Sequence, residues 1–229
     1  MDPHVNYEEL KTIALKESVV LFGVADVAPV RGTFILPEGL VQRFSFGISL
    51  GFRLARTILE TVVDAPSQMY YFHYQRINML LDQTALKLTS FIQENGYDAL
   101  PVPASQIIDW DKQLGAVSHR EIARLAGHGW YGRNNLMVNE RYGSQVRYVT
   151  VLTDMPLITD SPVKGDCGAC RACVTLCPAH AIKESGFDRD ACHLKLKEFT
   201  KIQRIGQMIC GVCLKCCPGN KQLGNRRKD

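Results

Sequence analysis

The sequence predicts an α/β (α+β) body with a mixed sheet over residues 1–160, followed by a cysteine-rich module over residues 161–229. Three observations lead to this division. All nine cysteines lie between residues 167 and 217, so the first 166 residues have none. Helical and strand periodicities alternate through that cysteine-free part, with both hairpin-type and crossover-type strand connections. Pro156, Pro162 and Gly165 mark the linker between the two modules.

The composition is typical of a globular protein, with 46% hydrophobic and 22% charged residues in a chain of 229. The N-terminus, M-D-P-H-V-N-Y-E-E-L, has no basic start and no twin-arginine pair. No apolar run reaches the length that spans a membrane. We therefore expect a cytoplasmic protein without a membrane partner.

The elements of the body follow from helix caps and periodicity. Asn6 and Glu9 form a capping-box pattern that predicts a first helix near 7–20. A second capping box, Ser118 with Glu121, opens a short helix that ends at Gly127. The other expected helices cover about 53–63 and 68–95, and the other expected strands are Val19–Val24, Tyr97–Val102, and a pair formed by Leu136–Val138 and Gln145–Thr153.

The stretch Phe44–Gly51 alternates large apolar and small residues, which predicts a strand with one buried face. The small residues of the other face are Ser45, Gly47, Ser49 and Gly51. Another group can therefore lie close against this backbone. A packed helix is the expected occupant, and a flat cofactor is the alternative.

Two further segments carry candidate cofactor contacts. The long helix starts with M-Y-Y-F-H-Y-Q-R-I-N, in which His73, Arg76 and Asn78 stand among aromatic residues that otherwise suit a core. The loop G-H-G-W-Y-G-R-N-N, residues 127–135, has three glycines within six residues. Its backbone can approach a ligand closely, although a tight turn explains the glycines equally well.

The first cysteine run, C-G-A-C-R-A-C-V-T-L-C-P, has the spacing of bacterial ferredoxins, C-x2-C-x2-C-x3-C-P. Three closely spaced thiolates let one short loop hold three corners of an iron–sulfur cubane. In two-cluster ferredoxins the fourth cysteine of the run serves the other cluster. The second half of the module supplies a matching set, which is Cys192, Cys210, Cys213 and Cys217.

Cross-ligation then assigns the ligands of two [4Fe–4S] clusters. Cluster one takes Cys167, Cys170, Cys173 and Cys217, and cluster two takes Cys177, Cys192, Cys210 and Cys213. Cys216 is left over, because the spacing from Cys213 to Cys217 repeats that of the first run. The alternative is zinc, which prefers two separated C-x2-C pairs around one ion and suits this order less well.

The net charge of +4 is unevenly distributed. Residues 193–229 hold nine basic and two acidic side chains, a net +7 (9 − 2), which leaves −3 for residues 1–192. A basic end can attract an acidic partner such as nucleic acid or a flavodoxin-like donor. The same charges can instead offset two anionic clusters, so the charge alone does not decide.

Three features in this order resemble the epoxyqueuosine reductases, a family related to the reductive dehalogenases. They are I-A-R-L-A-G-H-G-W-Y-G-R-N-N-L, then Y-G-S-Q-V-R-Y-V-T-V-L-T-D-M-P-L, then the two cysteine runs with Cys192 between them. The likeness covers roughly 118–220 well and the first hundred residues loosely. It implies a nitroreductase-like body that holds a corrinoid (cobalamin), and a bacterial-ferredoxin-like two-cluster module that passes electrons to cobalt.

The chain departs from that family in three places. Family members continue into a helical-repeat domain that grips tRNA, whereas this chain ends at Asp229, so we expect no specific tRNA binding. The acid proposed for the family aligns with Gln113, whose amide does not donate a proton at neutral pH. The segment that follows, A-V-S-H-R-E, also differs from the family, so Asp111 or His119 would have to act as the acid. Reductive dehalogenases typically have twin-arginine signals and longer bodies, and neither occurs here.

We therefore predict an iron–sulfur oxidoreductase. Electrons from a ferredoxin- or flavodoxin-type donor would pass through both clusters to a corrinoid or another redox group, for a reductive reaction on a small substrate. Candidate catalytic residues are Asp111, Gln113 and His119; candidate cofactor contacts are His73, Asn78, Gly129, Trp130, Gly132, Arg133 and Asn134. The alternative is a non-catalytic electron-transfer or assembly protein without a corrinoid.

Overall fold

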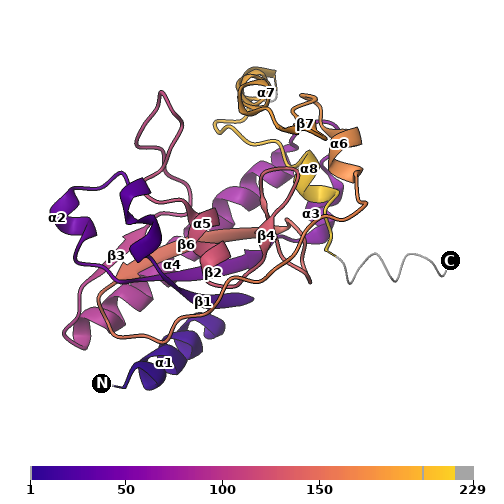
Figure 1. The fold of residues 1–229 in the computed structure, drawn as a ribbon. Helices are drawn as coiled ribbons and strands as arrows, with labels where there is room; N and C mark the ends of the chain where they lie inside the picture. Colours follow the sequence, from indigo (N-terminus) through magenta and orange to yellow (C-terminus); the bar gives the residue numbers. More distant parts are fainter. Residues whose placement is uncertain (1, 203, 220–229) are drawn as a thin grey trace. The chain divides into compact units, whose positions relative to one another are not determined.

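The structure, a computed structural model, describes residues 2–202 and 204–219 (Figure 1). The chain forms two compact units, each assembled from several segments. The first, which we call the sheet unit, comprises residues up to 52 together with 77–128 and 147–163. The second, the cysteine unit, comprises 53–76, 129–146 and the chain from 164 onward. The cysteine runs therefore share their unit with two segments of the preceding chain.

The sheet unit is built on a four-stranded sheet in the order β1-β2-β6-β3. Its strands are β1 (Leu21–Asp26), β2 (Phe46–Arg53), β3 (Ala99–Val102) and β6 (Val146–Thr153). β1 pairs antiparallel with β2, from Leu21 opposite Gly51 to Asp26 opposite Phe46, and β3 pairs antiparallel with β6. Between β2 and β6, the Ser45 N–H donates to the Thr153 carbonyl (3.2 Å).

The α/β class predicted from the sequence is confirmed, but the sheet is antiparallel where a mixed sheet was expected. The helical stretch between β2 and β3 suggested a parallel crossover pair. Those two strands are not neighbours, because β6 comes later in the chain and inserts between them. The expected pairing of the last two strands is also wrong. β5 (Met137–Val138) pairs with β4 (Trp130–Tyr131) in the cysteine unit.

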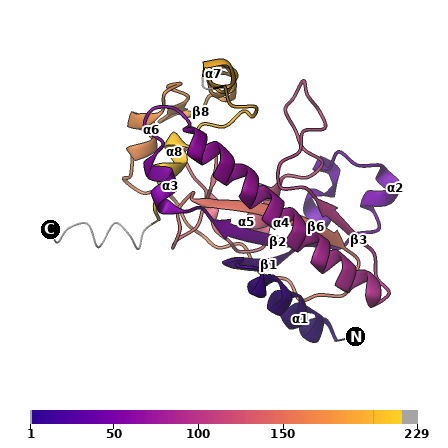
Figure 2. The same ribbon diagram turned by 180° about the vertical axis from the view of Figure 1, so that it is seen from behind.

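Helices cover both faces of this sheet. α4 (Gln68–Glu94) crosses one face, and α5 (His119–Leu125) lies on the other, as Figures 1 and 2 show. α4 ends before Gly96, which has the positive φ (83°) expected of a helix stop. The small-residue face of β2 is covered by α5, since a Cβ on Gly47 would lie 3.0 Å from the Ile122 side chain. The helix, and not a flat cofactor, is thus the occupant at Gly47.

Shorter elements complete the sheet unit: α1 (Pro3–Lys16), η1 (Ala28–Thr33) and α2 (Glu38–Val41). α1 begins earlier than predicted, because Asp2 caps it by accepting from the His4 N–H (2.7 Å). Asn6, the predicted cap, is buried inside the helix and donates to the Pro156 carbonyl (2.9 Å). The second predicted cap is confirmed, since the Ser118 side chain accepts from the Glu121 N–H of α5.

The cysteine unit consists of short elements: α3 (Arg56–Glu60), the first turns of α4, the β4–β5 hairpin, α6 (Ala172–Leu176), β7 (Ile182–Lys183), β8 (Gly186–Phe187), α7 (Arg189–Ile202) and α8 (Val212–Lys215). α6 packs against α8 and β7 (Figure 1). The sequence suggested one helical face from Cys192 to Ile209, but α7 ends at Ile202; Ile205 and Ile209 are buried beyond it. No helix in the described part of the chain is long and apolar enough to cross a membrane.

Candidate metal centre

The first cysteine run is shaped by a tight turn and a short helix. Gly168 has a positive φ (48°), and the Cys170 N–H donates to the Cys167 carbonyl (3.0 Å), which closes the turn between these two cysteines. Cys173 then lies within α6, and Cys177 ends that helix with an extended backbone. The Ala181 N–H donates to the Cys177 sulfur (3.4 Å) and so fixes its position.

The second run is shaped in the same way. Gly211, with φ at 87°, leads into α8, and a Cβ there would lie 2.8 Å from the Tyr70 ring. α8 carries Cys213, and its packing against α6 brings the two runs together. Cys217 follows the helix, with its N–H donating to the Leu214 carbonyl (3.2 Å).

The electrostatic neighbours of Cys173 define a first set of thiols. The pKa of Cys173 is raised to about 11, chiefly by burial and then by nearby Cys217, Cys167 and Cys170. Cys217 is itself affected by Cys167 and Cys170, whereas hydrogen bonds from Ser144 act in the opposite direction and lower its pKa. Three members come from the first run and one from the second, the combination that the spacing predicted for cluster one.

A second set surrounds Cys213. Burial raises its pKa well above the usual value, and Cys210, Cys216, Cys192 and Cys177 add to the effect. Burial likewise raises the pKa of Cys210 to about 11, with further contributions from Cys192 and Cys177. This set unites the last cysteine of the first run (Cys177), the lone cysteine of α7 (Cys192) and three members of the second run, which are Cys210, Cys213 and Cys216.

Cys216 lies beside both sets. Its sulfur donates to the Cys213 carbonyl (3.3 Å), and it packs on the apolar cluster that contains Cys173 and Cys177. Burial raises its pKa to about 12, and Cys173, Cys217 and Cys170 contribute in that order. Cys216 therefore lies near both sets of thiols, although the cysteine spacing does not predict it as a ligand of either cluster.

The donors fit iron–sulfur clusters. Several thiols crowded together resist ionisation unless cations compensate their charge, and cluster irons supply that compensation. Within the described residues, no three His, Cys, Asp or Glu side chains are arranged to hold a single metal ion. In a [4Fe–4S] cluster each thiolate binds a different iron, so its four ligands need not converge on one point.

Two residues predicted as corrinoid contacts instead hold the cysteine runs. Arg133 donates from Nη2 to the Gly168 carbonyl (2.7 Å) and from Nε to the Cys170 carbonyl (3.2 Å). Asn134 is buried, and its Nδ2 donates to Ser144 Oγ (3.1 Å) and to the Cys213 carbonyl (3.3 Å). Both side chains therefore anchor backbone within the cysteine unit.

Sequence reasoning missed the segment that follows, Gly143–Gln145. Gln145 Nε2 donates to the Lys215 carbonyl (2.9 Å), and the Ser144 N–H donates to the Cys217 carbonyl (3.1 Å). The backbone of the second run passes so close to Gly143 that a Cβ there would lie 1.9 Å from the Cys217 carbonyl. The available signal was the Y-G-S-Q sequence, which we interpreted only as the turn between two strands.

The glycines of the predicted cofactor loop are required because neighbouring protein atoms leave no room for a Cβ. A Cβ on Gly129 would lie 2.0 Å from the Val138 carbonyl, and one on Gly132 would lie 2.6 Å from the Val138 side chain. Trp130 packs against Gly165, whose added Cβ would meet the indole at 2.2 Å. These residues close the β4–β5 hairpin, so the tight-turn explanation accounts for them.

His73 also has a structural role. Its Nε2 accepts from the Ala55 N–H (3.0 Å) at the start of α3, and burial lowers its pKa. The imidazole is therefore neutral at Nε2 and holds α3 to the first turns of α4.

In the sheet unit, His119 bonds the segment that follows β3 directly, and Asn78 is linked to it through Arg147. His119 bonds the Thr150 hydroxyl through Nδ1 (2.8 Å) and the Pro103 carbonyl through Nε2 (2.9 Å), and burial lowers its pKa to about 4. Asn78 Oδ1 accepts from both Nε (3.2 Å) and Nη2 (3.0 Å) of Arg147, which also donates to the Ala104 carbonyl (2.8 Å).

A missed residue, Asp82, completes this network. Its carboxylate accepts from the Ala104 N–H (2.7 Å), and burial raises its pKa. With Asn78, Arg147 and His119 it holds the backbone at Pro103–Ala104, the start of the next loop.

That loop carries the other two candidate catalytic residues. Asp109 and Leu114 form a β-bridge, so the loop turns back on itself and places exposed Asp111 at its tip. Gln113 has a positive φ (52°), and its side-chain amide donates to the Trp110 carbonyl. Asp111 is thus accessible, whereas Gln113 stabilises the turn.

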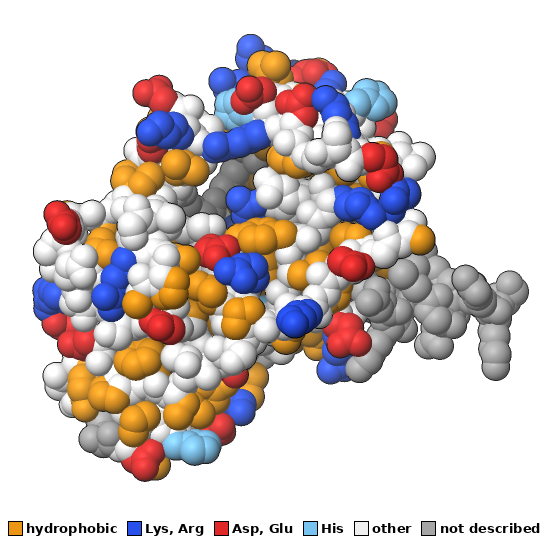
Figure 3. Space-filling view, in the orientation of Figure 1, with side chains coloured by type: hydrophobic (Ala, Val, Ile, Leu, Met, Phe, Trp, Pro, Cys, Tyr) orange, Lys and Arg blue, Asp and Glu red, His pale blue; other side chains and the backbone are white. Residues whose placement is uncertain are grey.

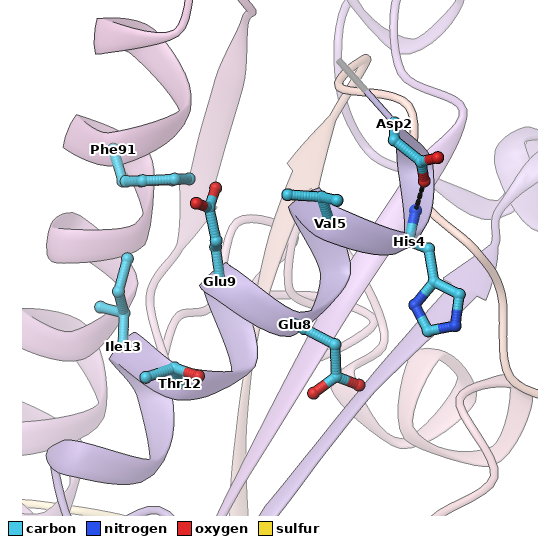
Figure 4. Close-up of a pocket in the computed structure, with 8 residues that line it drawn as sticks. All are labelled: Asp2, His4, Val5, Glu8, Glu9, Thr12, Ile13 and Phe91. Atoms are coloured by element: carbon cyan, nitrogen blue, oxygen red, sulfur yellow. Dashed lines mark hydrogen bonds between the residues drawn. The ribbon is translucent and has the colours of Figure 1, made fainter.

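One pocket, of about 600 Å³, lies elsewhere on the sheet unit. Figure 4 shows that its wall is formed by side chains of α1 with Phe91 of α4 opposite them. None of the candidate residues lines it.

Curated relatives of this chain are epoxyqueuosine reductases. The one from Bacillus anthracis is 28% identical over 158 residues, which cover 65% of this chain and 40% of the relative. The chain therefore spans about 40% of the length of the relatives it matches. No model of a known protein family matches it.

Solved structures show the same fold. A reductive dehalogenase, described with a mechanism for B12-dependent dehalogenation, superposes with a TM-score of 0.74 at 19% identity over 94% of this chain and 32% of its own. Epoxyqueuosine reductase from Streptococcus thermophilus superposes with a TM-score of 0.66 at 18% identity, over 93% of this chain and 66% of its own. The resemblance expected from the sequence is thus confirmed: this chain is similar in sequence to the epoxyqueuosine reductases and shares its fold with them and with reductive dehalogenases.

Proposed function

We propose that this chain is an iron–sulfur redox protein that transfers electrons through two [4Fe–4S] clusters toward a reductive reaction. The observation that carries the proposal is the division of the thiols into two sets. Each set combines residues of both cysteine runs, and each contains the four ligands that cross-ligation requires.

When bound, the clusters supply one-electron transfer. The protein's part is to hold the ligands. Donors from 129–146 fix the carbonyls of both cysteine loops, and the Ala181 N–H donates to the Cys177 sulfur. Hydrogen bonds to ligand sulfurs and to the loops around them orient the ligands and tune the site.

The destination of the electrons is proposed from the relatives. One structural neighbour is described as a B12-dependent dehalogenase, and the curated relatives are named for reduction of epoxyqueuosine. We propose a reductive step on a small substrate, with electrons from a ferredoxin- or flavodoxin-type donor. Of the three candidate catalytic residues, Asp111 is the best placed to donate a proton, because its carboxyl is exposed. In His119, by contrast, both imidazole nitrogens already form hydrogen bonds within the protein.

The residues predicted to hold a corrinoid do not fit that role. Arg133 and Asn134 bond the cysteine loops. The space beside Gly129 and Gly132 is occupied by Val138 of the β4–β5 hairpin, and α5 covers Gly47. This observation favours the second candidate function, a carrier that delivers electrons to a separate acceptor.

Iron and sulfide analysis tests the two clusters. Anaerobically reconstituted protein should contain about eight iron and eight sulfide per chain. Adjacent cysteines provide a matched pair: Cys216→Ser should leave the iron content unchanged, whereas Cys217→Ser should remove about half of it. About four iron in the unmodified protein, or stoichiometric zinc, would contradict the proposal.

A further inference from the structure

The two cysteine loops are held by donors of different charge. In the first run, the carbonyls of Gly168 and Cys170 accept from the guanidinium of Arg133, at 2.7 and 3.2 Å. The second run is held by neutral groups: the amides of Asn134 and Gln145 and the backbone N–H of Ser144. Among the described residues, a guanidinium from the 129–146 segment is thus bonded to the carbonyls of the first loop, whereas the groups from this segment that bond the second loop are neutral.

A second guanidinium reaches the same two carbonyls. Arg171 donates from Nη1 to the Gly168 carbonyl (3.0 Å) and to the Cys170 carbonyl (3.2 Å). Its charge is compensated, because Arg171 also forms an ion pair with Glu184. Arg133 forms no ion pair with any residue that the structure describes; the nearest carboxylate that bonds this loop is that of Asp166, which accepts from the Gly168 N–H (2.6 Å).

The lysines near the second run are engaged differently. Lys195 pairs with Glu198 (2.7 Å), and its charge also acts on Cys210, where it lowers the pKa of the thiol against the larger effect of burial. Lys215 directs its ammonium to backbone carbonyls of the α3 region, those of Glu60 and Val62. Neither ammonium is bonded to a carbonyl of the second run.

We propose that Arg133 raises the reduction potential of the cluster held by Cys167, Cys170, Cys173 and Cys217. The inference rests on the proposed two-cluster function. A cluster gains one negative charge when it accepts an electron, and a fixed positive charge on the adjacent loop stabilises the reduced form. Arg133 therefore favours the reduced state of this cluster.

The test is a potentiometric titration followed by electron paramagnetic resonance on the anaerobically reconstituted full chain. The component that Cys170→Ser abolishes identifies the first cluster. Arg133→Gln, which removes the charge but keeps an amide donor, should shift this component to a more negative potential and leave the other unchanged. Arg56→Gln is the matched control: its side chain is exposed and paired with Glu60, so neither potential should move.

Glu184→Gln provides an opposite test that leaves the first loop's donors in place. The substitution removes the ion-pair partner of Arg171. A second guanidinium without an ion pair is then bonded to the carbonyl of Gly168. The first component should then move to a more positive potential. This variant decides the question if Arg133→Gln fails to retain eight iron.

The outcomes separate the two proposals. An unmodified protein without eight iron contradicts the two-cluster function itself. The role of Arg133 alone is overturned if the protein holds eight iron but the potential of the first component does not change. This must hold in Glu184→Gln, and also in Arg133→Gln where that variant retains its clusters.

Discussion

His119 shows how the hydrogen bonds of one half-buried side chain can exclude it from proton transfer. Its two ring nitrogens bond the Thr150 hydroxyl and the Pro103 carbonyl, and burial lowers its pKa to about 4. An imidazole with so low a pKa is neutral near pH 7 and is a poor proton donor there. The residue therefore acts on stability, by holding the backbone at Pro103.

This role predicts a pH dependence of folding. The folded pKa of about 4 lies below the unfolded value of about 6.5, so the stabilisation is complete above pH 6.5 and is lost as the pH falls toward 4. The loss is on the order of 3 kcal/mol at most. Anaerobic urea unfolding between pH 7 and 4 measures it.

The matched variants for this prediction are His119→Gln and His4→Gln, the latter at an exposed position of α1. His119→Gln should be less stable at pH 7 and should lose less stability on acidification, whereas His4→Gln should follow the unmodified protein. An acid sensitivity that stays the same in His119→Gln would show that other groups cause it.

At the scale of elements, the connection between β5 and β6 supports the second cysteine run. Gly143 has a positive φ (59°), and an added Cβ would lie 1.9 Å from the Cys217 carbonyl. Both the conformation and the space therefore require glycine at this position. The two neighbouring residues donate hydrogen bonds to the same run.

Gly143→Ala should therefore displace the second run. We expect a loss of stability of about 2 kcal/mol or more, together with weaker retention of iron by the cluster that uses Cys217. Gly39→Ala is the control, because Gly39 lies in α2 with no atom within 4 Å of an added Cβ. Iron content after desalting and the urea midpoint are the measurements. Equal behaviour of the two variants would refute the supporting role of Gly143.

The elements that the sequence predicted well are those set by local signals. α4 follows from its long helical period and from the stop at Gly96, and α5 follows from the Ser118 cap. The errors arose where distant segments compete. Asn6 has the side chain of a cap but is drawn inside α1 to bond Pro156, 150 residues away. β6 inserts between two earlier strands, which no local pattern reveals.

The candidate site divides in the same way. Cysteine spacing is a local property, so the two ligand sets could be proposed from the sequence. The residues that hold the loops could not, because their acceptors are backbone carbonyls such as those of Gly168 and Cys213, which every residue possesses. Arg133 and Asn134 were predicted as cofactor contacts, and the contacts that the structure shows for them are with the backbone of the cysteine runs.

At the scale of the whole molecule, segments of the body contribute to the cysteine unit. Residues 53–76 and 129–146 fold with the cysteine runs, and the candidate cofactor contacts His73 and Arg133 lie in these segments. Basic charge in this part of the chain is interspersed with acidic side chains on the face shown in Figure 3. Four of the nine basic residues counted near the C-terminus lie outside the described residues: Lys221, Arg226, Arg227 and Lys228.

The arrangement of both units leads to a prediction for cobalamin. The backbone at Gly47 is covered by α5, Gly129 and Gly132 are filled by the β4–β5 hairpin, and Arg133 bonds a cysteine loop. A corrin needs open backbone and free polar groups along its amide rim, and these residues offer neither. Titration of cob(II)alamin into the anaerobic protein should therefore leave its electron paramagnetic resonance spectrum as that of the free, base-on form. The B12-dependent reductive dehalogenase with the same fold is the positive control under identical conditions. A base-off spectrum that saturates at micromolar protein would contradict this expectation, and it would place the reductive chemistry on this chain instead of on a separate acceptor.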